Sequence, residues 1–187
     1  MSLSPQDFSK QWGESLTTVD EKTLSALPLT ATDRAFLLQA GLPASAAPFL
    51  SFDLSDYRLK RIHEIWGHSF EYSAEEKEEL EPYCVIGSDG SGSPIAIDTL
   101  NLGRVVHLDH DDWFSTVTLV NSSVPQLAAF LLLTKNMIQT ANAELSAEAR
   151  NEGIPETYLA VVLQSMAVVD AEAMQEGCFW PSALRGL

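Results

Sequence analysis

The sequence predicts an α+β fold in which helices pack around a small, twisted, mainly antiparallel sheet. Four short runs rich in β-branched residues follow one another between residues 83 and 120, separated by residues that favour tight turns. A capped, apolar helix follows the last run at once. At 187 residues the chain is long enough for one domain with a substantial core and short for two. We therefore expect a single domain over residues 1–187.

The four predicted strands are Tyr83–Gly87, Ile95–Asp98, Val105–Asp109 and Thr116–Val120. Gly, Ser and Asp fill the segment between the first two strands, and an acidic segment lies between the last two. Such residues give tight reversals, so neighbouring strands should pair antiparallel. The sheet should therefore be a meander.

The helix after the sheet has a clear start signal. Ser123 with Gln126 three residues later is a capping-box pattern, and Pro125 is tolerated because it falls in the first turn. The helix should continue to about Glu144. Its buried face should consist of residues at helical spacing, namely Leu127, Phe130, Leu131 and Thr134.

Two shorter helices are predicted near the N-terminus. Ser4 and Pro5 begin the first helix, and Gly13 ends it. Thr30 begins the second, and Gly41 ends it. The segment between these helices is mostly polar and should form a connection.

The segment between the second helix and the sheet has a mixed pattern. Phe49–Leu54 alternates apolar and polar residues, which favours a strand. Tyr57–Phe70 is compatible with either a helix or a strand. Ser73 and Glu76 match a capping box that opens an acidic segment, Ala74–Glu81, and this segment can form at most a short, mostly solvated helix.

After the main helix, Ser146–Gly153 is polar and should form a break. A final helix is predicted over Glu156–Gln175, with Gly177 as its stop. Phe179 and Trp180 form an apolar tail that should pack back on the body of the protein.

The formal net charge of −15 limits the classes of partner. Nucleic acids and anionic membranes require clustered Lys and Arg, so the charge argues against direct binding to either. The charge permits electrostatic attraction to a basic protein partner, but solubility alone explains it equally well, and on the charge alone we favour solubility.

The sequence also indicates a compartment. No apolar run approaches the length that spans a bilayer, and the first residues lack the basic and apolar regions of a secretory signal. The two cysteines, Cys84 and Cys178, should therefore be reduced. We expect a cytoplasmic protein.

Two histidine patterns invite a metal-site interpretation. His63 and His68 lie five residues apart, which places them about 140° apart around a helix, whereas a zinc-protease helix needs histidines four apart. His107 and Asp109 would point to one side of a strand and could hold a divalent cation with Asp111 or Asp112. The alternative is a strand that ends in an acidic turn, where Asp accepts local backbone hydrogen bonds, and we favour it.

The serine-containing segments have simpler explanations than catalysis. Ser88–Ser93 precedes a strand rather than a helix and has no nearby Lys, so it is a hairpin turn rather than a phosphate loop. Ser122 and Ser123 lie at a helix start, where capping explains them. We therefore expect no enzymatic activity, no metal and no cofactor.

The order of these segments resembles the SUKH superfamily, which contains a fungal cell-wall-synthesis regulator and many bacterial immunity proteins that neutralise toxins. The likeness covers roughly residues 29–133 and is nearest to a bacterial immunity branch. The segments that carry it are Phe36–Pro43, Ile86–Gly90, Ile95–Asp98, Gly103–Asp109 and Val120–Ser123. The resemblance implies the same α+β fold, no metal, and a non-enzymatic protein that binds and occludes a cognate toxin domain.

The expected contact residues are surface acids and aromatics near the open face of the sheet and its turns. A toxin that acts on nucleic acid presents a basic cleft, which an acidic surface would complement. The first set is Asp89, Asp98, Asp111, Asp112 and Trp113, and the second set is Tyr72, Glu75, Glu76 and Glu79. Whether Trp113 belongs to the surface or to the core is left open by the sequence.

Two other functions remain open at the level of the sequence. One is a regulatory or scaffold protein without a toxin partner, as the fungal branch implies. The other is a metal-dependent enzyme around His107, Asp109 and Asp111. The segments outside residues 29–133 could carry specificity, above all the final helix and its aromatic tail.

Overall fold

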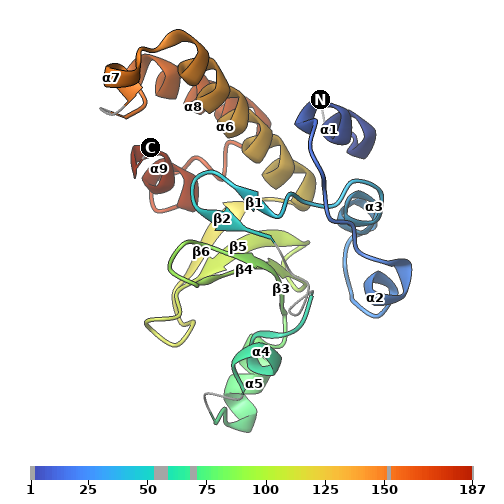
Figure 1. Cartoon of the computed structure of the whole chain (residues 1–187). Helices are drawn as coiled ribbons and strands as arrows, with labels where there is room; N and C mark the ends of the chain where they lie inside the picture. Colours follow the sequence, from blue (N-terminus) through green and yellow to red (C-terminus); the bar gives the residue numbers. More distant parts are fainter. Residues whose placement is uncertain (1–2, 53–58, 68–70, 151–152, 187) are drawn as a thin grey trace.

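The structure is centred on a six-stranded antiparallel sheet in which consecutive strands are neighbours (Figure 1). The computed structural model describes residues 3–52, 59–67, 71–150 and 153–186. The strands are β1 Ser45–Ala46, β2 Leu50–Ser51, β3 Tyr83–Ser88, β4 Pro94–Asp98, β5 Arg104–Leu108 and β6 Val117–Asn121. The α+β class and the meander order are confirmed, and the four main strands begin and end within one residue of their predicted bounds.

Along the sequence, helices lie before, between and after the strands of the sheet. Before β3 lie α1 Pro5–Trp12, α2 Glu21–Ser25, α3 Ala31–Gln39, α4 Ile62–Trp66 and α5 Ala74–Leu80. After β6 lie α6 Val124–Glu144, α7 Ala147–Arg150, α8 Glu156–Val169, α9 Phe179–Ala183 and a 3₁₀ turn at Leu184–Gly186. None of these described helices combines the length and the apolar composition that crossing a membrane requires.

The predicted helix caps are confirmed. Ser4 Oγ accepts a hydrogen bond from the backbone N–H of Asp7 at 3.1 Å, and Thr30 Oγ1 accepts one from Asp33 at 3.1 Å. Ser123 Oγ accepts one from the N–H of Gln126 at 3.4 Å, so α6 begins where the sequence predicts. Each cap satisfies a backbone donor that the first turn of a helix leaves without a partner inside the helix.

The helix α6 covers the first face of the sheet (Figure 1). The helices α1 and α3 pack beside α6, and α8 packs on the outer side of α6. Alternate strand residues such as Ile95 and Ile97 point to this face, because side chains alternate along a strand. They share a hydrophobic cluster with the predicted helix residues Leu127, Phe130 and Leu131. The same cluster contains Phe8 and Trp12 of α1 and Trp180 of α9, so both ends of the chain pack into it.

The second face of the sheet is also covered in part, which corrects the expectation of an open face. Val85, Ala96 and Val106 point to this side and pack with Ile62 of α4 and Leu80 of α5. The strands are therefore apolar on both faces, and this explains their nearly continuous runs of hydrophobic residues.

The final helix is shorter than predicted, because α8 ends at Val169 rather than at Gln175. Asp170 leaves the helical conformation, with φ −151° and ψ 85°, and the residue is only 4 % exposed. That carboxylate accepts hydrogen bonds from the backbone N–H and the hydroxyl of Ser122, both at 2.8 Å. A tertiary contact with the end of β6 therefore ends the helix, and Gly177 lies in the turn that follows.

Other segments differ in smaller ways. The predicted polar connection before α3 contains the short helix α2, and the predicted break after α6 contains α7. Only Leu50–Ser51 of the predicted strand Phe49–Leu54 is a strand, and residues 53–54 lie outside the described residues. In the ambiguous stretch Tyr57–Phe70, residues 62–66 form α4, and residues 57–58 and 68–70 lie outside the described residues.

Gly41 is required by a close approach of two backbone segments. It has φ +72°, and a Cβ atom there would lie 2.0 Å from the carbonyl oxygen of Thr17. Gly13 has the same φ of +72°, but a Cβ atom there would have its nearest neighbour at 4.0 Å. We expect Gly41→Ala to lower the free energy of unfolding by roughly 3 kcal/mol and Gly13→Ala by about 1 kcal/mol. Urea denaturation measures both values, and equal losses would contradict this steric account.

Candidate protein-binding surface

The turn between β5 and β6 presents a tryptophan outward and a phenylalanine inward. Trp113 is 63 % exposed, whereas Phe114 is buried. Both residues have positive φ, +63° and +65°, a conformation that costs a residue other than Gly about 1–3 kcal/mol. This answers the question that the sequence left open, because Trp113 lies at the surface.

Two carboxylates brace this turn from within. Asp112 Oδ1 accepts hydrogen bonds from the N–H groups of Ser115 at 3.1 Å and Thr116 at 3.3 Å, and its Oδ2 accepts the hydroxyl of Thr116. The hydrogen bond from the Thr116 hydroxyl and those from the backbone lower the pKa of Asp112. Asp109 Oδ1 accepts the N–H of Asp111 at 2.9 Å. The side chain of Asp111 itself is exposed.

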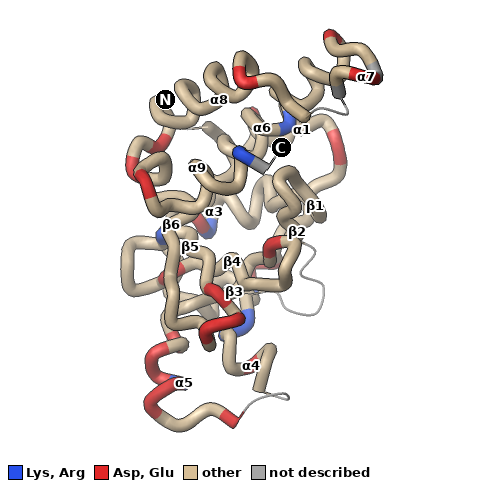
Figure 2. Tube along the Cα trace, turned by 90° about the vertical axis from the view of Figure 1, so that its left-hand side faces the viewer, with Lys and Arg blue, Asp and Glu red and all other residues tan. Residues whose placement is uncertain are grey.

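A second acidic element, α5, lies on the same side of the sheet. Glu75, Glu76 and Glu79 are all exposed, and Figure 2 shows the tube of this helix as mostly acidic. Glu76 also accepts the N–H of Ser73 at 2.7 Å in the predicted capping box, and the hydrogen bonds from Ser73 lower its pKa. Tyr72 is half-buried against the second-face cluster, and burial together with the charge of Glu76 raises its pKa.

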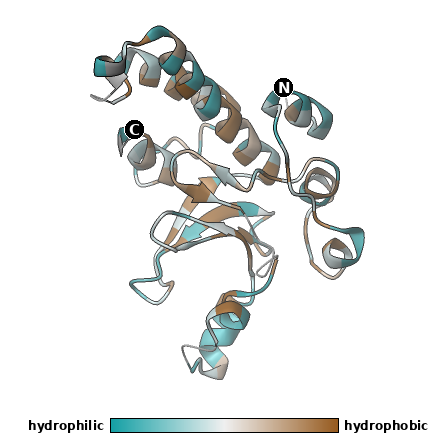
Figure 3. Cartoon of the chain, in the orientation of Figure 1, coloured by the Kyte–Doolittle hydropathy of each residue, from teal (hydrophilic) through white to brown (hydrophobic). Residues whose placement is uncertain are grey.

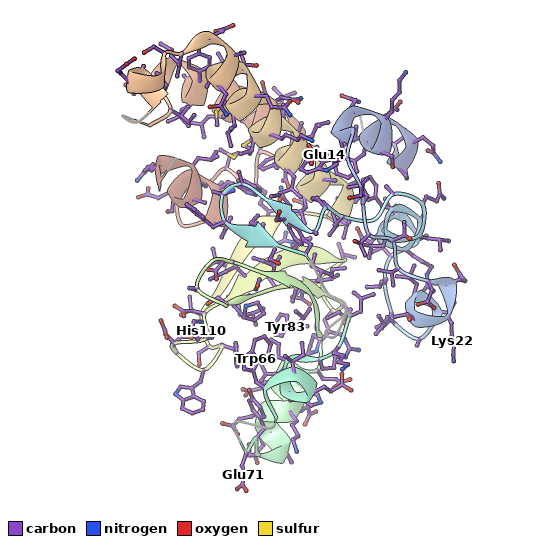
Figure 4. All side chains as sticks on the ribbon, in the orientation of Figure 1. Glu14, Lys22, Trp66, Glu71, Tyr83 and His110 are labelled. Atoms are coloured by element: carbon purple, nitrogen blue, oxygen red, sulfur yellow. The ribbon has the colours of Figure 1, made fainter. Side chains whose placement is uncertain are left out.

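One hydrophobic cluster joins the two acidic elements. Phe114 of the turn packs with Leu80 of α5 and Ile62 of α4, and its ring centroid lies 5.4 Å from that of Trp66. Figure 4 shows Trp66 and Tyr83 between the sheet and α4, with Glu71 at the far end of this region. We call this surface the acidic end, defined by Tyr72, Glu75, Glu76, Glu79, Asp111, Asp112 and Trp113.

Asp89 lies near the acidic end, but its carboxylate holds the turn between β3 and β4. Its Oδ1 accepts the N–H groups of Ser91 and Ser93, both at 2.9 Å, and its Oδ2 lies 3.0 Å from His107 Nε2. Burial would raise the pKa of Asp89, but the hydrogen bonds from Ser91, His107 and Ser93 outweigh it and lower that pKa. Asp89 is therefore a turn residue rather than a free surface acid.

Asp98 departs further from its predicted place at the surface. It is only 5 % exposed, and its carboxylate accepts the N–H groups of Leu100 and Asn101 at 3.0 and 3.1 Å. It is the last residue of β4, and the turn that follows it lies at the opposite end of the antiparallel meander from Trp113. We therefore leave Asp98 out of the acidic end.

The His107, Asp109 and Asp111 cluster does not converge on one point. His107 pairs with Asp89, Asp109 accepts the backbone of Asp111, and Asp111 Oδ1 lies 3.3 Å from His110 Nε2. No group of three or more His, Cys, Asp or Glu residues suited to a metal ion is found among the described residues. His68 of the other histidine pattern lies outside the described residues.

The structure also brings together a serine, a histidine and an aspartate that local spacing did not indicate. Ser93 Oγ lies 2.7 Å from His110 Nδ1, and His110 Nε2 lies 3.3 Å from Asp111 Oδ1. The order of these three side chains resembles the nucleophile, general base and orienting acid of a catalytic triad. However, Ser93 is only 2 % exposed and its Oγ also accepts the N–H of His110 at 3.3 Å. These contacts join two neighbouring turns, and the hydroxyl is buried between them.

A comparison with protein families places the chain. The pattern of the SUKH-4 immunity proteins matches residues 3–185. The chain belongs to the SUKH-4 immunity protein family. The resemblance seen in the sequence is confirmed, and the match extends beyond residues 29–133 to include α1, α8 and α9. Searches of curated proteins and of solved structures found no match.

The turn role of Asp89 in this SUKH-4 chain can be tested by stability. We expect Asp89→Ala to lower the free energy of unfolding at pH 7 by about 1–2 kcal/mol, because it removes the acceptor of several hydrogen bonds. The pKa of Asp89 is lowered in the folded state, so its contribution is present above the unfolded pKa and is lost as the pH falls through the folded pKa. The cost of the substitution should therefore shrink toward pH 3.

Asp111→Ala is the matched control for Asp89, since Asp111 is exposed on the neighbouring turn. We expect its cost at pH 7 to be within about 0.5 kcal/mol of zero. Urea denaturation across pH measures both variants. An Asp89→Ala loss that does not change with pH would show that the ionised carboxylate is not what stabilises the turn.

Proposed function

We propose that this SUKH-4 chain is a non-enzymatic immunity protein that binds a cognate protein toxin domain and occludes its active site. The observation that carries the proposal is the acidic end, where a strained, braced turn holds Trp113 outward beside Asp111 and the glutamates of α5. Residues kept at positive φ by surrounding hydrogen bonds are typical of functional sites.

Charge supports a basic partner, such as a toxin that acts on nucleic acid. Residues 71–81 contain Glu71, Glu75, Glu76, Glu78, Glu79 and Glu81 against the single Lys77, and the turn at 109–115 contains three Asp and no Lys or Arg. An acidic surface attracts a basic cleft during diffusion and raises the association rate. It would also compete directly with the phosphates that such a cleft binds.

An exposed aromatic side chain, Trp113, would add binding affinity to the faster association that the acids provide. Interface energy is concentrated in a few buried side chains, among which Trp is enriched, while charges at the rim contribute less. Trp113 extends from a turn whose backbone Asp109 and Asp112 already hold, so little loop freedom remains to be lost on binding. We therefore propose that Trp113 is the anchor residue of the interface and that the surrounding acids orient the partner.

The direct test of function is growth rescue in the cytoplasm. The C-terminal domain of the large protein encoded beside this gene is expressed with and without this chain. Specific rescue, with a stable complex that weakens as salt is added, supports an immunity protein that uses charge. Toxicity without rescue would instead favour a regulatory or scaffold function.

The acidic end can be tested by neutralising exposed acids that do not cap a helix or brace a turn. We expect Glu75→Gln, Glu79→Gln and Asp111→Asn together to weaken toxin binding about tenfold, mainly through slower association. The matched control is Glu21→Gln, Glu156→Gln and Glu176→Gln, which removes the same charge from exposed acids elsewhere. Surface plasmon resonance at two salt concentrations measures both rates. Equal effects of the two triple variants would show that only net charge matters.

The anchor role of Trp113 has its own matched control. Leu102 is 85 % exposed with φ +60° in the β4–β5 turn, so it shares the exposure and the backbone strain of Trp113 at the other end of the sheet. We expect Trp113→Ala to weaken toxin binding by about 2–4 kcal/mol. Leu102→Ala should leave the affinity unchanged. A folded Trp113→Ala protein with full affinity would remove Trp113 from the interface.

A further inference from the structure

The directions of the strands bring three turns to one end of the sheet. Neighbouring strands run antiparallel, so β1, β3 and β5 all run toward the same end. The turns that follow these strands are residues 47–49, 89–93 and 109–116, and Figure 1 shows all three on the left-hand side of the sheet. We call these three turns the turn rim. The β4–β5 turn lies at the opposite end of the sheet.

The turn rim presents two aromatic side chains, one from each of its outer turns. Phe49 is 75 % exposed with φ +59°, and Trp113 is 63 % exposed with φ +63°. Of the other described non-glycine residues with positive φ, Leu59 and Phe114 are buried in the core, whereas Leu102 is exposed in the β4–β5 turn. Burial offsets backbone strain in the core, but exposed side chains gain little burial. Strain of this kind is typical of functional sites, and Phe and Trp are enriched at interfaces whereas Leu is under-represented among anchors.

Contacts between neighbouring turns join the turn rim into one surface. A Cβ atom on Gly90 would lie 3.0 Å from the Cβ atom of Phe49, so the bare backbone of Gly90 lets the first turn lie close against the second. Ser93 Oγ lies 2.7 Å from His110 Nδ1 and accepts the backbone N–H of His110 at 3.3 Å, which joins the second turn to the third. The three turns are therefore held in place before a partner arrives, which lowers the entropy lost on binding.

The two outer turns lie at a distance that suits separate anchors within one interface. Four strand spacings of about 4.8 Å separate the centres of the β1–β2 and β5–β6 turns, which gives about 19 Å. A standard interface buries about 800 Å² on each partner and is therefore roughly 30 Å across. One partner can thus cover both Phe49 and Trp113. Because side chains this far apart do not touch, their contributions to binding should add.

Charge selects the kind of partner that fits the turn rim. The three turns contain four Asp and no Lys or Arg. Lys135 lines a hollow beside Phe49, but it pairs with Glu14 at 2.7 Å and so adds no free positive charge. In Figure 3 the strands behind the rim are largely hydrophobic and the β5–β6 turn is largely hydrophilic. Such an acidic surface attracts a basic partner and repels a second copy of a chain whose net charge is −15.

We propose that the turn rim forms one continuous interface for the basic toxin domain, with Phe49 as a second aromatic anchor alongside Trp113. The inference rests on the proposed function, because it assigns a further contact to the same partner. The toxin domain would present two apolar pockets about 20 Å apart at the border of its basic cleft. Because each pocket must match its anchor in position and shape, the pair of anchors also restricts which toxin the chain can bind.

Affinity for the toxin domain of the rescue experiment tests the second anchor. We expect Phe49→Ala to weaken binding at least about tenfold, because it leaves the pocket of a buried anchor empty. The Phe49→Ala/Trp113→Ala double variant should lose about the product of the two single losses, because the anchors do not touch. The matched control is Leu100→Ala, since Leu100 is 77 % exposed in the β4–β5 turn at the opposite end of the sheet, and its affinity should be unchanged. Isothermal titration calorimetry measures all four proteins.

The outcomes separate this inference from the proposed function. A Phe49→Ala protein with full affinity, beside a weakened Trp113→Ala protein, would overturn the second anchor and leave the immunity function standing. Equal losses for Phe49→Ala and Leu100→Ala would also overturn it, because the effect would not depend on the turn rim. An unmodified chain that neither binds the toxin domain nor rescues growth would overturn the proposed function itself.

Thermal unfolding tests, without the toxin, whether Phe49 serves the fold instead. Glycine adopts φ +59° without strain, so Phe49→Gly should keep the thermal midpoint within about 2 °C of the unmodified chain or raise it. Leu59 has a similar φ of +54° but is only 4 % exposed, so Leu59→Gly should lower the midpoint by roughly 10 °C, because it removes a core side chain. A comparable fall for Phe49→Gly would show that packing holds Phe49 in place, and it would contradict the anchor role.

Discussion

The buried carboxylate of Asp170 is the contact on which the C-terminal part of the structure depends. It accepts hydrogen bonds from the N–H and hydroxyl of Ser122 and from Nδ2 of Asn121. Asn121 Oδ1 in turn accepts the indole N–H of Trp180 at 3.0 Å. Because an unpaired buried carboxylate is very costly, these donors require the end of α8, the end of β6 and α9 to meet at one place.

Contacts of α6 with α3 and α1 position the N-terminal part of the chain. At its start, the buried Asp33 of α3 accepts the N–H of Val124 at 2.9 Å, and burial raises the pKa of Asp33 despite that hydrogen bond. Further along, Lys135 donates to the carbonyl oxygen of Trp12 and lies over its ring, which fixes α1. The ends of the chain thus lie in the same hydrophobic cluster as the sheet, and the family match covers them as well.

Covering the second face of the sheet has a functional consequence. Phe114 must turn inward to meet Ile62 and Leu80, and the adjacent Trp113 is then held outward. The packing of one aromatic residue thereby exposes its neighbour and places the β5–β6 turn on the same side as α5.

By itself, the sequence determined the α+β class, the four main strands and the helix caps, because alternation, helical spacing and capping act within a few residues. It also placed the candidate acids on turns and on α5. Only the tertiary structure decided which acids remain free. Asp98 is enclosed by its own turn and Asp89 is held by His107, whereas Asp111 and the α5 glutamates stay exposed. Ser122, which is far from α8 in the sequence, decides where α8 ends, because it donates hydrogen bonds to Asp170. The outward position of Trp113 depends on the burial of Phe114 against Ile62 and Leu80, which are also far away in the sequence.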